Sequence, residues 1–432
     1  MLPLLSNSEF LLMSQTNRLL PELRFPEFRE SEEWKTNSLS KLAHSVKEKA
    51  KKLKPEDVLT LSGEHGLVRQ TDYFGKKIAG SDLKRYLRIE QNDFVYNDRT
   101  TSAAKYGSLK RLTNYNLGAV SPIYKCFRFS KQEKPIFWEH YFDAGAHENG
   151  LSAFVNEGAR AGRFNISVDT FLSISVCYPS EPEQQKIADC LGSLDDLIAA
   201  HSRKLAALQD HKKGLLQQLF PAEGETTPKL RFPGFDGEWE EHAISEIFDT
   251  ATGGTPERKN GDYWGGDVPW ITTSLVDFSI ITSAEQFITK EGVKNSSAKI
   301  FATGTILIAM YGQGKTRGQV ALLGIQAATN QACAAILPND NTTPYFVFQN
   351  LSNRYNELRS LSNDGGQKNL SQGLIRGLPI SLPKDIKEQQ KIADCLSALD
   401  ALITAESEQI AALKEHKKGL MQKLFPNPTH KK

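Results

Sequence analysis

The chain has few cysteines, no long apolar run and almost no net charge. Its five cysteines include no Cys-x-x-Cys pair, which argues against a disulfide framework and predicts reduced thiols in a cytoplasmic protein. No apolar stretch approaches the roughly 20 residues of a membrane span, and the N-terminal residues lack the basic segment of a signal peptide. A net charge of +2 over 432 residues does not by itself indicate a nucleic-acid partner.

Motifs of a reaction centre are also missing from the sequence. There is no glycine-rich nucleotide fingerprint, no Asn-Pro-Pro-aromatic or Asp-Pro-Pro-aromatic tetrapeptide of adenine methylation, and no His-Glu-x-x-His. The segment Gly312-Gln-Gly-Lys315-Thr316 follows an apolar run, but a Walker loop there would need glycine at position 309, where the chain has Ala309. The nine histidines are scattered and predict no metal site. The sequence therefore predicts a non-catalytic chain that binds no metal or cofactor of its own.

What the sequence does contain is an internal repeat. Residues 183–221 and 388–426 are identical at 27 of 39 positions, with a constant offset of 205. A shorter repeat, Leu-Arg-Phe-Pro-x-Phe, opens each half of the chain and is followed closely by Trp34 or Trp239. Two equivalent halves in one chain predict pseudo-two-fold symmetry.

Each 39-residue repeat predicts one long helix. Residues at alternating steps of four and three form a heptad seam, which the second repeat reproduces: Ile187, Leu191, Leu194, Ile198, His201, Leu205, Leu208, Lys212, Leu215 and Leu219. Ser180 with Glu183 is a capping-box pattern at the start of the first repeat, and Asp385 with Glu388 is its acidic counterpart. Such a helix would be about 57 Å long, which suits a spacer better than a core element.

The stretches outside the repeats predict two α+β domains with the same order of elements. In the first we expect strands at 58–61, 93–97, 122–129 and 171–178 and a helix at 135–142; in the second, strands at 268–272, 305–310, 319–323, 332–337 and 377–382 and a helix at 344–361. The predicted division is an N-terminal extension (1–20), a first globular domain (21–179), a central spacer helix (180–221), a linker with the second globular domain (222–382), and a C-terminal spacer helix with a tail (383–432).

Charge is divided unevenly between the two domains. Residues 35–178 carry 23 Lys and Arg against 15 Asp and Glu, whereas residues 240–382 carry 11 against 13. Basic side chains mixed with aromatic and polar ones are typical of a DNA-facing surface, although a solvated face is the alternative. The candidates in the first domain are Lys76, Lys77, Lys84, Arg85, Arg99 and Thr100. The lysines at 47, 49, 51, 52 and 54 are interpreted as a helix flank or a linker, with contact to the DNA backbone as the alternative.

Two kinds of glycine-rich loop supply further candidate DNA contacts. One is a predicted loop tip with Gln313, Lys315, Thr316 and Arg317, for which a plain hairpin tip is the alternative. The other is a pair of loops at 158–165 and 364–369, which overlap a motif found in both halves at 162–167 and 366–371 and in which glycine would let the backbone approach a ligand. These loops contribute Arg160, Arg163, Asn165, Gln367, Lys368 and Asn369, and a plain turn before the last strand is their alternative.

In combination these features resemble the specificity subunit of type I restriction-modification enzymes. The second domain carries segments that resemble sequence motifs of that family's target recognition domains: Gly253-Gly-Thr-Pro256, Tyr263-Trp-Gly-Gly266, Val268-Pro-Trp270-Ile, Ile306-Leu-Ile-Ala-Met-Tyr-Gly312 and Ala328-Thr-Asn330-Gln331-Ala. The Glu-Gln-Gln-Lys-Ile-Ala segments look like its helical spacers. The resemblance adds Asn330 and Gln331 to the candidate DNA contacts.

The resemblance implies both a fold and a set of partners. The fold would be α+β, with two target recognition domains separated by two long antiparallel coiled-coil helices. Each domain would read one half of a split, asymmetric site in double-stranded DNA. The partners would be two methyltransferase subunits and two motor-nuclease subunits, which would bind S-adenosylmethionine, ATP and Mg²⁺. Alanines on the spacer helices are candidate contacts for partner helices, or simply good helix formers: Ala188, Ala199, Ala207, Ala393 and Ala412.

Two other classes of protein stay open at this point. A single-chain enzyme, or a fragment of a fused one, would need a catalytic tetrapeptide or a cofactor loop. A coiled-coil assembly protein with carbohydrate- or protein-binding lobes would fit the acidic second domain. The salt dependence of DNA binding separates these hypotheses, because the affinity of a protein that contacts DNA phosphates falls as the salt concentration rises.

Overall fold

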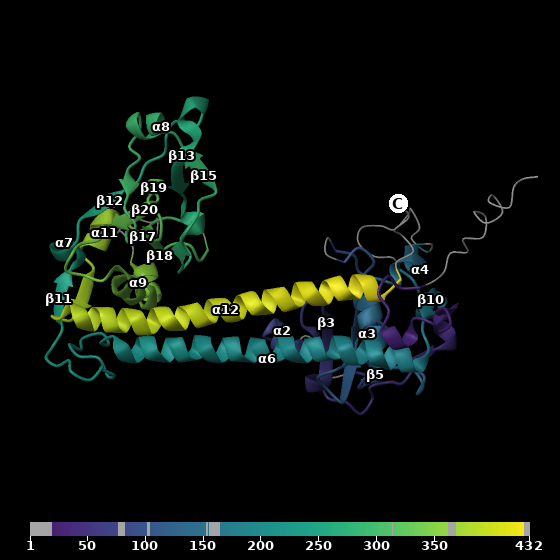
Figure 1. The fold of residues 1–432 in the computed structure, drawn as a ribbon. Helices are drawn as coiled ribbons and strands as arrows, with labels where there is room; N and C mark the ends of the chain where they lie inside the picture. The colour runs from purple at the N-terminus through teal and green to yellow at the C-terminus, as the bar shows by residue number, and fades with distance from the viewer. Residues whose placement is uncertain are drawn as a thin grey trace, which may run out of the picture. The chain divides into compact units, whose positions relative to one another are not determined.

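The chain folds into two compact units (Figure 1). The computed structural model describes residues 20–76, 83–101, 104–152, 154, 165–312, 314–361 and 369–426. Unit 1 contains the residues up to His201 and those from Gln409 onward, and unit 2 contains Ser202–Glu408. Unit 1 is thus built from both ends of the chain and unit 2 from its middle. No helix among these described residues is both long and apolar enough to cross a membrane.

The globular part of unit 1 contains two four-stranded sheets. The first has the order β2 (Ala43–Ser45), β9 (Lys125–Phe129), β6 (Phe94–Asn97) and β7 (Ser108–Arg111), and the second has β4 (Gly66–Arg69), β3 (Val58–Ser62), β8 (Leu117–Val120) and β5 (Leu87–Glu90). A separate pair joins β1 (Lys35–Ser38) to β10 (Ser175–Tyr178). The helices are α2 (Gln70–Phe74), α3 (Pro135–Asp143), α4 (Glu148–Ser152) and α5 (Val168–Leu172).

The globular part of unit 2 repeats this plan. Its first sheet has the order β12 (Thr250–Thr252), β20 (Cys333–Ile336), β17 (Ile306–Ala309), β18 (Val320–Leu323) and β14 (Ile280–Ile281), and its second has β15 (Gln286–Ile288), β13 (Trp264–Ile271), β19 (Ala327–Thr329) and β16 (Ile300–Phe301). Here β11 (Glu240–Ala243) pairs with β21 (Pro379–Leu382). The helices are α7 (Ile244–Ile247), α8 (Lys290–Lys294), α9 (Pro344–Asn353), α10 (Tyr355–Ser360) and α11 (Gln372–Arg376).

Strand pairing shows that the two domains share one core topology, to which unit 2 adds the edge strand β14. In each second sheet the central pair, β3 with β8 or β13 with β19, is parallel, and the flanking pairs are antiparallel. In the first sheets, Ser45 pairs with Phe127 and Thr252 pairs with Ala334. Residues around β2 and β9 therefore correspond to those around β12 and β20 with an offset of 207. The prediction that the two domains are diverged copies is confirmed.

The two repeats form the helices α6 (Glu181–Leu219) and α12 (Ile386–Leu424), each of 39 residues. Every predicted seam position of α6, and its copy in α12, is buried or half-buried. In unit 2 the helices run antiparallel, because Lys204 pairs with Glu406 and Lys212 pairs with Asp400. The equivalent pair in unit 1 joins Lys417 to Asp195. The predicted antiparallel coiled coil is thus confirmed within each unit.

The short repeated motifs close each unit around an aromatic core. Trp34 packs edge-on against Phe425 at the end of α12 in unit 1. In unit 2, Trp239 packs in the same way against Phe220, just after the end of α6. Backbone hydrogen bonds repeat the match, since Leu23 N donates to the Lys423 carbonyl and Leu230 N to the Gln218 carbonyl, both at 2.9 Å. The repeated sequence therefore specifies the same local structure twice.

A buried ion pair completes each copy of this arrangement. Arg24 donates from Nε and Nη2 to the carboxylate of Glu183 at 2.8 and 2.7 Å. Arg231 makes the same two-pronged contact with Glu388, at 2.8 Å for both bonds. The two glutamates are 1% exposed. Each long helix is therefore joined at its start to the segment that leads into the adjacent globular domain.

Two predicted elements differ from the structure. The predicted strand at 171–178 is only β10, because Phe171 belongs to α5, which Ser167 caps by accepting from Thr170 N. The predicted helix at 344–361 is divided into α9 and α10 at Arg354, whose guanidinium is held by Glu357 and the Pro379 carbonyl. The lysine run at 47–54 is a linker, one of the two alternatives predicted for it: it joins β2 to a 3-10 helix at Pro55–Asp57, with residues 47–49 extended, Lys49 bridged to Leu87 of β5, and residues 51 and 52 in a turn.

Candidate nucleic-acid interface

In unit 2, the edge where β12 ends and β20 begins is packed through two glycines. A Cβ on Gly253 would lie 2.1 Å from the carbonyl oxygen of Thr329, and a Cβ on Gly254 would lie 2.4 Å from the Ser297 carbonyl carbon. Gly254 N also donates to the Thr329 carbonyl at 2.8 Å. Only glycine allows this approach, so the Gly-Gly-Thr-Pro segment is fixed directly against the segment that contains Asn330 and Gln331.

That packing positions two of the predicted DNA contacts. The Thr255 hydroxyl donates to Gln331 Oε1 at 2.5 Å, and Gln331 is exposed. The Asn330 side-chain oxygen accepts from Ala332 N at 3.1 Å, which turns the chain into β20. The side-chain amides of both residues are donor groups suited to base edges or phosphates. The structure thus brings Asn330 and Gln331 together at one sheet edge.

An arginine beside this edge was not among the sequence predictions. The Arg258 guanidinium lies 4.7 and 5.1 Å from the ring centroids of Trp264 and Trp270, and it donates to Gln286 Oε1 at 3.2 Å. Arg258 is exposed, so the rings orient its planar group while the remaining N–H groups face solvent. The sequence feature that could have identified Arg258 as a candidate is its position two residues after the Gly-Gly-Thr-Pro motif. We add Arg258 to the candidate DNA contacts.

The predicted loop after β17 places its basic residues in two different settings. Lys315 is exposed, and its carbonyl accepts from the Tyr355 hydroxyl at 2.5 Å. Arg317 is half-buried and donates to the Arg359 carbonyl at 2.8 Å, so its guanidinium holds the loop against α10. Thr316 is also half-buried, and Gln313 lies outside the described residues. Lys315 is therefore the basic side chain of this loop that is open to a ligand.

The candidates of unit 1 fall on two sheets. Lys76, which follows α2, and Lys84 and Arg85, which precede β5, are exposed on the β4-β3-β8-β5 side. Arg99 is exposed and Thr100 half-buried at the end of β6 in the other sheet, at the place that corresponds to the Lys315 loop of unit 2. The structure does not unite the two sets on one sheet.

The copied glycine-rich motifs are described only at their ends. Asn165 is exposed with a φ of 56°, and it precedes the cap of α5. Asn369 is half-buried shortly before α11. The other predicted contacts in these loops lie outside the described residues, as does one of the first-domain lysines: Arg160, Arg163, Gln367, Lys368 and Lys77.

The structure separates the candidate partner-facing alanines into two groups. Ala188 and Ala393 are both 2% exposed and belong to the hydrophobic cores of unit 1 and unit 2 respectively, because their helix face packs on the globular domain. The prediction that these two contact partner helices is wrong for this structure. Ala199, Ala207 and Ala412 are exposed and remain candidates.

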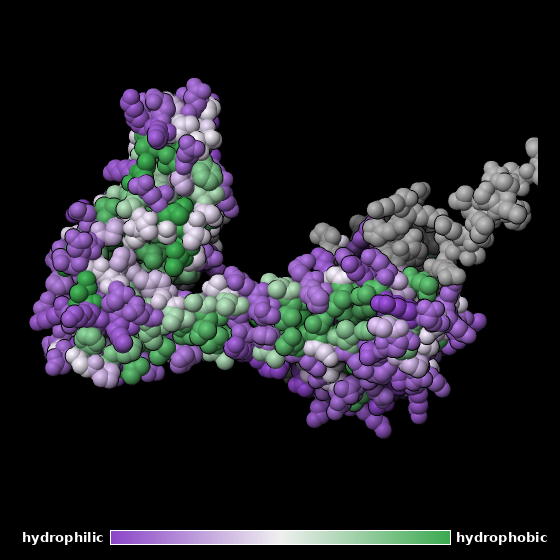
Figure 2. Space-filling model, viewed as in Figure 1, coloured by the Kyte–Doolittle hydropathy of each residue, from purple (hydrophilic) through white to green (hydrophobic). Residues whose placement is uncertain are grey.

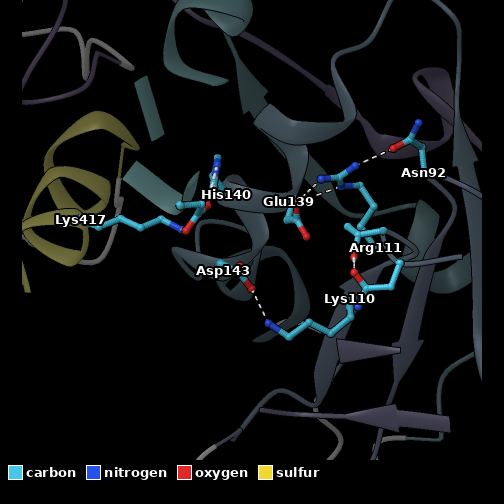
Figure 3. Close-up of polar contacts among 10 residues, drawn as sticks. Asn92, Lys110, Arg111, Glu139, His140, Asp143 and Lys417 are labelled. Atoms are coloured by element: carbon cyan, nitrogen blue, oxygen red, sulfur yellow. Dashed lines mark hydrogen bonds and ion pairs between the residues drawn. The ribbon is translucent and has the colours of Figure 1, made fainter. Parts of the chain in front are cut away.

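In unit 1, helix α3 links a strand of the globular domain to the long helices (Figure 3). Arg111 of β7 donates to Glu139 Oε2 at 2.9 and 2.5 Å, and Lys110 donates to Asp143 at 2.9 Å. His140 directly follows Glu139 on α3, and its Nε2 lies 3.6 Å from an Asp195 oxygen on α6. His140 is 2% exposed, and neither ring nitrogen has a hydrogen-bond partner among the described atoms.

Burial, and secondarily the nearby Lys417, lowers the pKa of His140 to about 4. The ring is therefore neutral near pH 7, and its approach to Asp195 is not an ion pair. Both α3 and α9 begin with proline, at 135 and 344, and on that alignment His140 corresponds to Gln349. Gln349 Nε2 donates to Asp400, the copy of Asp195, at 2.7 Å.

The His140 environment predicts that acid destabilises unit 1. Between pH 6.5 and 4 the unfolded chain protonates this histidine whereas the folded chain does not, so stability falls with pH, by up to about 3 kcal/mol at pH 4. His140→Gln introduces the residue found at the corresponding position of unit 2, Gln349. We expect it to reduce the pH dependence of the unfolding free energy between pH 6.5 and 4. The measurement is urea unfolding at a series of pH values. Burial also lowers the pKa of His147 to about 4, so some dependence of stability on pH should remain in the variant. If the unfolding free energy of the variant falls with pH as steeply as that of the wild type, the prediction is contradicted.

Part of the chain is similar in sequence to known proteins. Residues 236–415 match the family described as the type I restriction modification DNA specificity domain. The chain is 33% identical over 179 residues to the MjaIX type I restriction enzyme specificity subunit of Methanocaldococcus jannaschii, covering 40% of each chain. It is 28% identical over 179 residues to the EcoR124I/EcoR124II specificity subunit of Escherichia coli, covering 40% of this chain and 44% of that protein. The chain thus aligns with less than half the length of these two relatives.

The fold comparison extends over almost the whole chain. A crystal structure of a type I restriction-modification S subunit from M. genitalium superposes with a TM-score of 0.59 at 15% identity, covering 95% of this chain and 100% of that one. A chain from a structure of type I R-M complex assembly superposes with a TM-score of 0.53 at 18% identity, covering 91% and 98%. The predicted α+β fold with an internal repeat and two long helices is confirmed, and so is the resemblance stated from the sequence.

Proposed function

We propose that this chain is the DNA-recognition subunit of a type I restriction-modification complex, because residues 236–415 match the DNA specificity domain of that system and the fold is similar to that of solved S subunits. It would act in the cytoplasm as a non-catalytic subunit. It would carry no cofactor, and S-adenosylmethionine, ATP and Mg²⁺ would be bound by its partner subunits.

The target would be a split, asymmetric sequence in double-stranded DNA, one half for each domain. One observation carries this proposal: two domains with the same core topology, which differ by one edge strand, are attached to near-identical helices but present different side chains. Two domains with the same backbone framework suit a DNA site with two halves. Because their surface side chains differ, the two halves would have different sequences. The exposed candidates at equivalent loops, Arg99 and Lys315, are donors of the kind that contact phosphates and guanine edges.

The long helices would also dock two identical methyltransferase subunits, and through the same complex two motor-nuclease subunits. Leu197 of α6 and Leu402 of α12 are copies of each other, and they are 42% and 56% exposed. Hydrophobic residues reach the surface along α12 (Figure 2). An exposed leucine kept at the same position in both repeats supports two equivalent sites for one partner, and Ala199, Ala207 and Ala412 are further exposed positions on the same two helices.

Sequencing of methylated adenines in the host genome tests the proposal. We expect a split motif with a gap of fixed length and two different halves, which disappears when the gene for this chain is deleted. Restoring the gene is the control and should restore methylation at the same sites. A continuous motif, or a split motif that persists in the deletion strain, would refute the assignment.

The same assay tests the role of Lys315. Complementation with Lys315→Ala is expected to reduce methylation and to relax the sequence preference in only one half of the motif. A lysine that contacts a base contributes about 1–3 kcal/mol to the discrimination between the correct base and the others, and the variant would lose that discrimination. Arg317→Ala is the informative comparison, because it removes a contact inside the loop and should lower the stability of unit 2. Equal relaxation of both halves by Lys315→Ala would contradict the placement.

A further inference from the structure

A groove of about 430 Å³ opens in the recognition domain of unit 1, between the segment that follows β2 and the segment that precedes β9. Its lining includes Lys47, Lys49, Tyr124 and Lys125, together with apolar residues and Ser167, and none of the lining residues is acidic. The groove is therefore a cationic depression with one aromatic wall.

The segment after β2 is held firmly between the two sheets. Val46 N donates to the Cys126 carbonyl of β9, and Arg88 N of β5 donates to the Glu48 carbonyl at 2.8 Å. Because the chain is extended here, side chains two residues apart point to the same side. Lys47 and Lys49 share that relation, both are exposed, and neither has an ion-pair partner in the part of the chain that the structure describes.

The third lysine of the groove has a different role. Lys125 Nζ donates to Asp98 Oδ2 at 2.5 Å and to the Ile123 carbonyl at 3.3 Å, and the Asp98 side chain is 1% exposed. The Lys125 charge is thus balanced by a buried carboxylate behind it. The unbalanced charge of the groove belongs to Lys47 and Lys49.

The 207-residue offset between the domains locates the same edge in unit 2. On this register Lys47 corresponds to Gly254 and Tyr124 to Gln331. In unit 2 a side chain at Gly254 would collide with Ser297, so that edge is closed and offers the amide of Gln331 instead. The edge where the sequence predicts DNA contacts in unit 2 is therefore the edge that is open and lysine-lined in unit 1.

We propose that this groove binds the sugar-phosphate backbone of the DNA half-site read by unit 1, with Lys47 and Lys49 contacting phosphates. A compact ammonium on a flexible stem suits a phosphate as a point charge and carries no base code. Lys125, held by Asp98, positions the floor of the groove. The inference rests on the proposed function and assigns phosphate contacts to residues that the sequence pattern had placed on a helix flank or linker.

The test compares two double variants of the full chain, in the complex that it forms in its host. Lys47→Ala/Lys49→Ala removes the groove lysines, and Lys51→Ala/Lys52→Ala removes the same charge from the adjacent exposed turn. Binding to a duplex with the methylated motif, and to a scrambled duplex, is measured over a range of salt concentrations. We expect the groove variant to reduce the slope of log K against log salt by about 2, and affinity at least about tenfold, on both duplexes.

Each outcome decides the proposal. A groove variant with the slope of the wild type, or the same loss in both double variants, overturns it while the proposed function stands. A wild-type complex that does not distinguish the motif from the scrambled duplex overturns the proposed function, and this inference with it. Melting temperature controls for folding, and if the double variant melts early, Lys47→Ala and Lys49→Ala separately are each expected to remove about one unit of slope.

Discussion

Replacing Arg231 by methionine is expected to lower the free energy of unfolding of unit 2 by about 3–5 kcal/mol. The substitution leaves the Glu388 carboxylate, which is 1% exposed, buried at the start of α12 without its cation. The same junction is packed by Trp239, Phe220 and the first turns of α12. Loss of the ion pair would therefore expose the core of unit 2. Urea unfolding followed by circular dichroism measures the effect.

The matched control is the double variant Arg231→Met/Glu388→Met. Because a buried pair replaced by apolar side chains of similar volume is often neutral, we expect the double variant to recover most of the loss. Arg24→Met makes the same change in unit 1 and is expected to destabilise that unit instead. A loss of less than about 1 kcal/mol in Arg231→Met would mean that water reaches Glu388 and that the pair is not structural.

The second large effect is expected from Gly253→Ala. The new Cβ would lie 2.1 Å from both the carbonyl and the hydroxyl oxygen of Thr329, and the carbonyl belongs to a central strand region that has no room to move. Overpacking of this kind costs about 1–3 kcal/mol or more. Since the same approach positions Thr255 against Gln331, we also expect loss of sequence preference in one half of the methylated motif.

Gly261→Ala is the control for this prediction. Gly261 begins a short 3-10 helix in the same loop region, and a Cβ there would meet nothing within 4 Å. It should leave both the melting temperature and the methylated motif unchanged. If Gly253→Ala behaves like Gly261→Ala, the tight packing of the Gly-Gly-Thr-Pro segment is not what positions the candidate contacts.

Elements with a strong local signal could be predicted from the sequence. The heptad seam of α6 and α12 is a property of neighbouring turns, so the residue pattern alone located both helices and their buried face. Strands in the middle of a sheet, such as β6 and β17, are short runs of buried apolar residues and were also found. Two-residue strands such as β14 and β16 were not, because their pairing is set by partners far along the chain.

The candidate site was predictable only in part, for the same reason. Residue type pointed to Lys315 and Gln331, which the structure leaves exposed, but it equally pointed to Arg317, which packs against α10. Arg258 was missed because its orientation depends on two tryptophans that the sequence places six and twelve residues later. The DNA contacts themselves remain predictions.

The sequence by itself determined the duplication, the two long helices and the resemblance to a family, because repeats, heptads and motifs are local patterns. Only the tertiary structure decided which side chains are available for binding. It buried Ala188 and Ala393, and it opened a groove beside Lys47 where unit 2 has a closed edge at Gly254. Exposure of a side chain depends on segments distant in sequence that pack around it, and no local pattern records which segments those are.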